Sequence, residues 1–203
     1  LDTSHTLSLS CVLFMPITII ETQKLKLSLL IPDDNALMQR YLLLNKDYLA
    51  PWEPSRAEDF FSRGEIDLRI KSALLRFKQR SACQLVILNK AEDEVLGVCN
   101  FSNMTHIATQ SCHLGYSVGQ QHVGQGIMHE ALTHAIHYVF QHYPIHRINA
   151  NYLPHNLRSA NVLAKLGFAI EGFAKSYLKI NGVWQDHVLT ALINPADFSL
   201  KQD

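Results

Sequence analysis

A six-residue turn between a strand-like segment and a helix-like segment constrains the fold most: Gln121-His122-Val123-Gly124-Gln125-Gly126. Residues 112–118 alternate and carry β-formers, whereas apolar residues recur at helical spacing from Ile127 to Tyr143. A glycine-bearing turn that opens a helix presents unpaired backbone N–H groups at the positive end of the helix dipole. We therefore expect residues 121–126 to bind a phosphate or pyrophosphate.

Two common phosphate-binding motifs do not fit this turn. A Walker-type loop requires Gly-Lys-Ser/Thr, but Gly126 is followed by Ile127 and Met128. A dinucleotide fingerprint requires a third glycine, and His129 stands in its place. The acidic residue expected about 20 positions further on is also missing. The turn therefore predicts a phosphate-bearing ligand of another class.

Composition limits the class of protein. The chain has 203 residues, with 18 Lys and Arg against 18 Asp and Glu, so no global field favours nucleic acid or an anionic membrane. No apolar run approaches the roughly 20 residues that span a bilayer. None of the four cysteines forms a C-x-x-C pair, which predicts reduced thiols and a cytoplasmic location. They are Cys11, Cys83, Cys99 and Cys112.

The chain has eleven histidines, which raises the question of a zinc site. His129-Glu130 and His134 have H-E-x-x-x-H spacing, one residue longer than the metalloprotease helix. His134 and His137 lie at i and i+3 but lack a nearby acidic or cysteine third ligand. We predict no metal.

The order of predicted elements is βααβββαβαββ, typical of a single α/β or α+β domain with a mixed sheet. Strands are expected at 24–31, 84–88, 95–102, 112–118, 146–152, 168–180 and 183–193, and helices at 33–44, 57–80, 127–143 and 156–166. In the second helix the expected apolar stripe includes Leu68 and Leu75. Pro51 and Pro54 predict a stiff loop without helix, and Asn181-Gly182 predicts a tight hairpin turn.

Three parts of the chain are expected. Residues 1–15 fit poorly with the rest and lack the positive start of a signal peptide. Met15-Pro16 is a candidate natural start, so residues 1–15 are interpreted as an N-terminal extension, native or artificially added. Residues 16–198 form the single domain, and residues 199–203 form a C-terminal tail.

Three motifs in order identify a family. The turn reads Q-x-x-G-x-G, Asn156-x-x-Ser159 follows, and Leu163-Ala164-Lys165-Leu166-Gly167-Phe168 comes next. This combination resembles the GNAT superfamily of acetyl-CoA-dependent N-acetyltransferases. The resemblance implies a mixed, mainly antiparallel sheet flanked by helices. It also implies a splayed central pair of strands at 112–118 and 146–152, with the pantetheine arm of acetyl-CoA in the opening.

Five further segments resemble the members of this superfamily that acetylate the N-terminal alanine of a small-subunit ribosomal protein. They are residues 48–54, 97–103, 114–117, 150–156 and 184–192. The implied partners are acetyl-CoA and that ribosomal N-terminus. Two alternatives stay open: acetylation of a small-molecule or antibiotic amine, and a CoA-binding ribosome-assembly factor whose catalysis is dispensable.

The resemblance also implies the residues that bind the cofactor. Backbone N–H groups of Val123, Gly124, Gln125 and Gly126 are expected on the pyrophosphate. The pantetheine amides are expected on the backbone of Tyr116, Ser117 and Val118. Asn156 and Ser159, at i and i+3, are expected near the sulfur. The alternative for Asn156 is helix capping alone.

The same resemblance suggests candidate catalytic residues. Many superfamily members carry a tyrosine acid where Leu163 stands, so Ser159 is the expected substitute for protonating the leaving thiolate. Related enzymes carry a glutamate base at about Leu178. An α-amine has a pKa of about 7.7–8.0, against about 10.4 for lysine, so a weak base suffices.

On the substrate side, Trp52 is expected to wall the acceptor pocket and Glu53 to hold the ammonium group. The alternative for Trp52 is that it only anchors the loop on the core. Glu53 is also a candidate base, together with Glu171, Asp186 and His187, for which structural roles are the stronger expectation.

Overall fold

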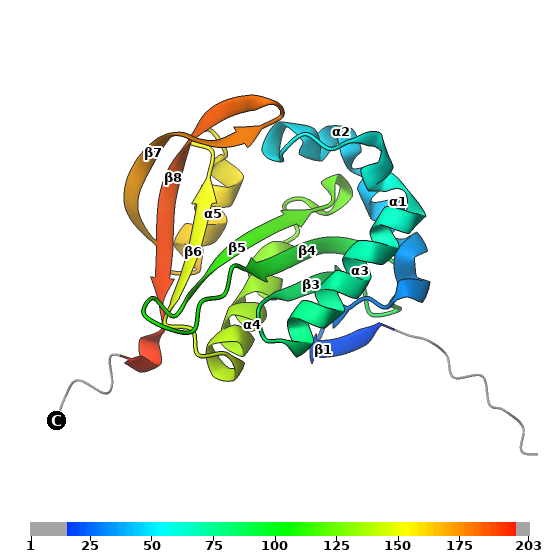
Figure 1. The fold of residues 1–203 in the computed structure, drawn as a ribbon, viewed down its shortest axis with the longest axis horizontal. Coiled ribbons are helices and arrows are strands. Elements are labelled where there is room, and N and C mark those ends of the chain that lie inside the picture. The colour runs from blue at the N-terminus through cyan, green and yellow to red at the C-terminus, as the bar shows by residue number, and fades with distance from the viewer. Residues whose placement is uncertain (1–15, 198–203) are drawn as a thin grey trace, which may run out of the picture.

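The computed structural model describes residues 16–197, which form one eight-stranded sheet with helices on both faces (Figure 1). The strands are β1 (Ile17–Glu21), β2 (Lys26–Leu29), β3 (Cys83–Leu88), β4 (Val95–Ser102), β5 (Ser111–Val118), β6 (Arg147–Tyr152), β7 (Ala169–Ile180) and β8 (Val183–Ile193). The helices are α1 (Asn35–Leu44), α2 (Lys46–Leu49), α3 (Arg63–Lys78), α4 (Ile127–His142) and α5 (Leu157–Lys165), with 3-10 turns η1 (Pro32–Asp34), η2 (Ala50–Trp52), η3 (Glu58–Phe61) and η4 (Gln120–His122). The expected extension at 1–15 and tail at 199–203 lie outside the described residues.

The sheet contains one parallel pair of strands, and that pair splays. The strand order is β1-β2-β3-β4-β5-β6-β8-β7, and only β5 and β6 run parallel. They pair over residues 111–113 and 147–149 and then separate, while α4 supplies the crossover that parallel strands require. The mixed, mainly antiparallel sheet with a splayed central pair is therefore confirmed.

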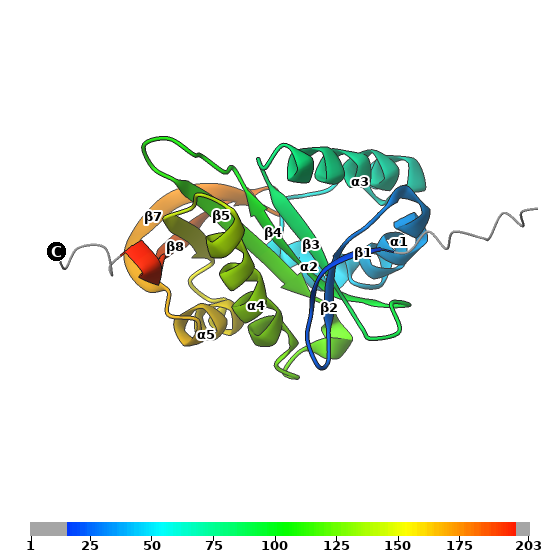
Figure 2. The same ribbon diagram turned by 90° about the horizontal axis from the view of Figure 1, so that it is seen from below.

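The two faces of the sheet carry separate cores. On one face α4 buries Leu132 and Val139, and α5 lies on the same side (Figure 2). On the other face α1 and α3 cover β2 to β4, where Tyr41, Ile66 and Ile70 are buried. Consecutive residues of a strand face opposite sides of the sheet. Neighbouring side chains of β5 therefore face two different compartments.

The helix predicted over 57–80 has the wrong start. It begins at Arg63, because Ser62 adopts an extended backbone and its hydroxyl accepts a hydrogen bond from the Glu65 N–H at 3.3 Å. This cap sets the phase of the helix. Leu68 and Leu75, expected in the apolar stripe, are 60% and 55% exposed.

The elements near Pro51 and the first strand also differ from the prediction. The chain takes a 3-10 turn at η2, although Pro51 predicted a loop without helix, because proline is tolerated in the first turn where its missing N–H is not needed. The single-turn helix α2 and the edge strand β1 were not predicted. β1 has three isoleucines among its five residues, a run too short to distinguish from a loop.

The hairpin of β7 and β8 is confirmed and reaches across the molecule. Asn181 and Gly182 both have positive φ, 43° and 80°, as a two-residue hairpin turn requires. At this tip the Asn181 N–H donates to the carbonyl of Glu53 at 2.9 Å. Figure 1 shows the tip beside α2, on the far side of the splay.

Candidate active site

The glycine turn presents free backbone donors. Gly124 and Gly126 adopt left-handed conformations, with φ of 80° and 78°, and α4 begins at Ile127. Within residues 16–197 the N–H groups of 124–126 donate to no other backbone atom, while the Val123 N–H has a long bond of 3.4 Å to Gln120. The Gln125 side chain donates to the Gln121 carbonyl at 2.8 Å and closes the turn.

The space in front of the two glycines is open. A Cβ added at Gly124 or Gly126 would meet no protein atom within 4 Å. Glycine is therefore required there by the positive φ, which costs other residues about 1–2 kcal/mol, and not by protein packing. Free donors, a helix N-terminus and open space together fit a diphosphate.

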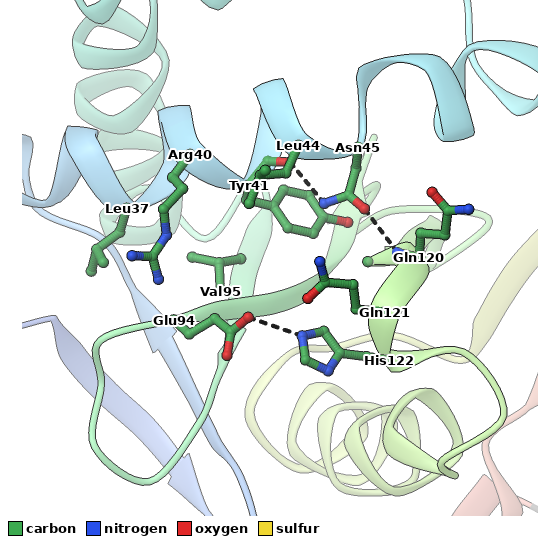
Figure 3. Close-up of a pocket in the computed structure, with 11 residues that line it drawn as sticks. Leu37, Arg40, Tyr41, Leu44, Asn45, Glu94, Val95, Gln120, Gln121 and His122 are labelled. Carbon is green, nitrogen blue, oxygen red and sulfur yellow. Dashed lines mark hydrogen bonds and ion pairs between the residues drawn. The ribbon is translucent and has the colours of Figure 1, made fainter.

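The turn is held from behind by a buried amide on the end of α1 (Figure 3). The Asn45 carboxamide donates to the Tyr41 carbonyl and accepts from the Gln120 N–H, both at 2.8 Å. His122 lies 3.1 Å from Glu94 on the β3–β4 connection. These contacts fix the path from β5 into the turn, and Asn45 was not singled out from the sequence.

The edge of β5 beyond the splay faces the opening. The Gly119 N–H donates to Leu96 at 2.8 Å, in register with the Gly97–Val118 pair. Because bonded and non-bonded pairs alternate along an antiparallel ladder, the backbone groups of Tyr116 and Val118 turn away from β4 toward β6, and those of Ser117 turn toward β4. Two of the three residues expected to bind pantetheine through their backbone thus point into the opening.

Close backbone approach shapes the other edge of β5, where it meets β4. A Cβ on Gly97 would lie 2.5 Å from the Ser117 carbonyl oxygen, a distance at which atoms must shift. Only glycine permits this contact between β4 and β5.

Ser159 and Tyr116 meet across the opening. The two hydroxyl oxygens are 2.7 Å apart, although the residues lie on α5 and β5. Burial raises the pKa of Tyr116 to about 12, so this hydroxyl stays protonated at neutral pH. Sequence reasoning assigned only the backbone of Tyr116, because a pairing across 43 residues leaves no local pattern.

Asn156 caps α5, with its side chain accepting from the Ser159 N–H at 3.1 Å. Asn156 therefore caps the helix, and the cap fixes the position of the Ser159 backbone. Leu163 is 1% exposed and packs in the α4-side core, and its side chain has no proton to donate.

Trp52 and Glu53 lie on the other side of β5. The Trp52 ring packs 5.5 Å from the His155 ring, between centroids, so it contacts the loop before α5. A Glu53 carboxylate oxygen is 3.5 Å from Arg56, a loose ion pair. Glu53 and Ser117 line one cavity of about 290 Å³, here called the acceptor-side cavity.

Three contacts bridge the opening on this side. They are the Asn181–Glu53 backbone bond, the Trp52–His155 ring contact and a 3.2 Å bond from Arg158 to the Tyr48 hydroxyl. Each joins the segment after α1 to the half of the sheet beyond the splay. Trp52 thus takes part in this bridge rather than standing free in a pocket.

The other base candidates have structural partners. Glu171 is ion-paired with Arg147, and Asp186 accepts from the Ser176 N–H at 2.7 Å. His187 is 4% exposed and its ring nitrogen lies 3.1 Å from the Gln185 carbonyl oxygen. Leu178 is 44% exposed and has no basic group.

Residues 16–197 contain neither a metal-ligand cluster nor a membrane-spanning helix. This part of the chain brings no three His, Cys, Asp or Glu side chains together in a group able to hold a metal ion. None of its helices is both long enough and apolar enough to cross a membrane.

Comparison with known proteins agrees with this geometry. Residues 24–169 match the family described as acetyltransferase (GNAT) domain. The ribosomal protein uS5-alanine N-acetyltransferase of Escherichia coli (strain K12) is 47% identical over 155 residues, 76% of this chain and 80% of that protein.

Two solved structures extend the similarity. Ribosomal-protein-S5-alanine acetyltransferase from Vibrio fischeri has a TM-score of 0.83 at 38% identity, covering 87% of this chain and 96% of that one. Mycobacterium smegmatis RimJ in complex with CoA-disulfide has a TM-score of 0.78 at 30% identity, covering 88% and 85%. The family resemblance and the fold expected from the sequence are confirmed.

Proposed function

The chain belongs to the acetyltransferase (GNAT) domain family, and on that premise we propose that it acetylates the N-terminal alanine of a small-subunit ribosomal protein in the cytoplasm. Acetyl-CoA is the acetyl donor. The 47% identity to a uS5-alanine N-acetyltransferase supports this acceptor over other amines. The observation that carries the assignment is that a diphosphate-type turn follows the splayed strand β5 and a cavity of about 290 Å³ lies beside the same strand.

The chain's own residues fit acetyl-CoA. The turn at 123–126 holds the diphosphate, and the outward backbone groups of Tyr116 and Val118 hold the pantetheine amides. Ser159 and Tyr116 place two hydroxyl groups where the arm ends, on the α5 side. The acetyl thioester supplies an activated carbonyl to the acceptor amine.

The acceptor amine attacks that carbonyl directly, so the new N–C bond forms as the C–S bond breaks. The Val118 N–H stabilises negative charge on the carbonyl oxygen, while the Tyr116 backbone groups and the Val118 carbonyl hold the pantetheine amides. Ser159, hydrogen-bonded to Tyr116, passes a proton to the leaving thiolate and regains one from solvent, so its hydroxyl is restored within the turnover. Glu53 holds the ammonium group, and the amine proton passes to water or to this carboxylate.

A covalent enzyme intermediate is unnecessary. Burial raises the pKa of Cys83 and of Cys112 to about 12 and raises that of Cys99 as well. These three thiols are therefore poor nucleophiles at neutral pH. Holding both reactants together supplies most of the rate.

Mass spectrometry with acetyl-CoA and a peptide that begins with alanine tests the proposal. We expect one acetyl group on the α-amine and none on lysine. The rate should rise with pH through an apparent pKa of about 7.7–8.0, that of an α-amine. Acetylation of small amines alone, or CoA binding without turnover on any α-amine, contradicts the proposal.

A further inference from the structure

The acceptor-side cavity is mostly apolar. It lies between α1, α3 and the face of β2 to β4, and its walls include Leu29, Met38, Leu42, Ile66, Ile70 and Val98. Its volume of about 290 Å³ is near the lower end of ligand sites, roughly 300–1,000 Å³. Ser117 and Glu53 place one end of it beside the proposed amine site.

Two carboxamides interrupt this apolar wall. Gln84 on β3 and Asn100 on β4 stand directly opposite each other in the ladder, and both line the cavity. Neither side chain has a hydrogen-bond partner within residues 16–197, and this part of the chain holds no buried side-chain N or O atom without a partner. Both carboxamides are therefore open to the cavity.

On the basis of the proposed function, we propose that Gln84 and Asn100 bind the peptide groups that follow the acceptor's N-terminal residue. A carboxamide has donors and an acceptor side by side, which matches the N–H and C=O of a peptide group. The occupant is thus an extended polypeptide, whose side chains meet the apolar walls. A small amine without a peptide group has no paired N–H and C=O to match both carboxamides.

The spacing of the strands agrees with this register. Asn100 pairs with Gly115 of β5, so Asn100 and Gln84 lie one and two strands away from β5. At about 4.8 Å per strand these positions are roughly 5 and 10 Å from β5. An extended peptide rises about 3.3 Å per residue, so its first three peptide groups cover that distance.

The open path beside β5 supports the same route. Gly115 is exposed, and a Cβ added there would meet nothing within 4 Å. Gln84, Asn100 and Gly115 occupy paired positions on three neighbouring strands. The position at the splay, Gly115, has no side chain. A chain crossing this row reaches β5 without steric obstruction from position 115.

The test compares acceptors of different length with two near-isosteric variants. Asn100→Leu and Gln84→Met remove the polar groups and keep the size, and Gln141→Met on the exposed face of α4 is the matched control. The kcat/KM is measured for alaninamide and for an alanine-starting tetrapeptide, with saturating acetyl-CoA. Melting temperatures verify that each variant is folded.

We expect each cavity variant to lose roughly 2- to 12-fold in kcat/KM on the tetrapeptide, the value of one hydrogen bond, and much less on alaninamide. The Gln141→Met control should match the wild type on both acceptors. An equal loss on both acceptors, or no loss on the tetrapeptide, overturns this inference. The proposed function still holds in that case if the wild-type protein acetylates the tetrapeptide. If the wild type acetylates no peptide, the proposed function itself fails.

Discussion

Replacing Asn45 with leucine tests whether the buried carboxamide behind the glycine turn positions the cofactor site. Asn45 is 7% exposed and makes two hydrogen bonds of 2.8 Å, one to Tyr41 and one from Gln120. Leucine has a similar shape and can make neither bond. The Tyr41 carbonyl keeps a partner, because it also accepts from the Asn45 backbone N–H at 3.1 Å. The Gln120 N–H loses its acceptor.

The magnitude follows from these two losses. A net hydrogen bond contributes about 1 kcal/mol, and a buried donor left without a partner costs about 1–3 kcal/mol. We therefore expect Asn45→Leu to lower the free energy of unfolding by roughly 2–4 kcal/mol. For a chain of this size that corresponds to a fall in melting temperature of roughly 5–15 °C.

The activity should change in a specific way. Gln120 leads directly into the turn at 121–126, so its displacement should raise the KM for acetyl-CoA more than it lowers kcat. Calorimetric melting and steady-state kinetics measure both effects, with Gln141→Leu as a surface control. An unchanged melting temperature together with an unchanged KM for acetyl-CoA would refute this reasoning.

Three further predictions concern the cofactor side. Gly124→Glu should abolish CoA binding in calorimetry and leave the fold intact, whereas Gly182→Ala, at the same φ of 80°, should keep full CoA affinity; unchanged affinity in Gly124→Glu counts against the assigned turn. Ser159→Ala should lower kcat by on the order of 10–100-fold with little change in CoA affinity. This effect is smaller than the largest effects of general acids, because a thiol with a pKa of about 8.5 is a good leaving group. A wild-type kcat in this variant would remove Ser159 from the mechanism. Because the pKa of Tyr116 is raised in the folded chain, the unfolded chain loses the hydroxyl proton at lower pH. The free energy of unfolding should therefore fall by roughly 2–3 kcal/mol as the pH rises from about 10 to about 12. Urea unfolding at these two pH values should show this loss in the wild type and a smaller loss in Tyr116→Phe.

Local patterns predicted most of the elements around the site. Alternation located β4 and β5, helical spacing located α4, and the positive-φ glycines marked the turn at 124–126 and the hairpin tip at Gly182. These features depend on residues close together in the sequence. The predicted start of α3 was wrong. The apolar pattern extends toward the N-terminus beyond Ser62, but the cap at Ser62 starts the helix at Arg63.

Contacts between distant elements could not be predicted. The Tyr116–Ser159 hydroxyl pair spans 43 residues, and the Asn45–Gln120 bond spans 75. Gln84 and Asn100 left a faint signal, as isolated polar residues within strands that are otherwise mostly apolar. Gln84 and Asn100 face each other because of the register between β3 and β4, which local sequence patterns do not determine.

In the proposed complex, the acetyl donor extends the sheet at the splay between β5 and β6. The two halves share only a short run of pairing at 111–113 and 147–149, and the outward backbone groups of Tyr116 and Val118 await a partner. Pantetheine amides that fill this place act as the missing strand segment. By linkage, ligand at 100 times its Kd stabilises the folded chain by about 2.7 kcal/mol. Since free CoA carries the same arm, the folded population would follow the total CoA pool and not its degree of acetylation.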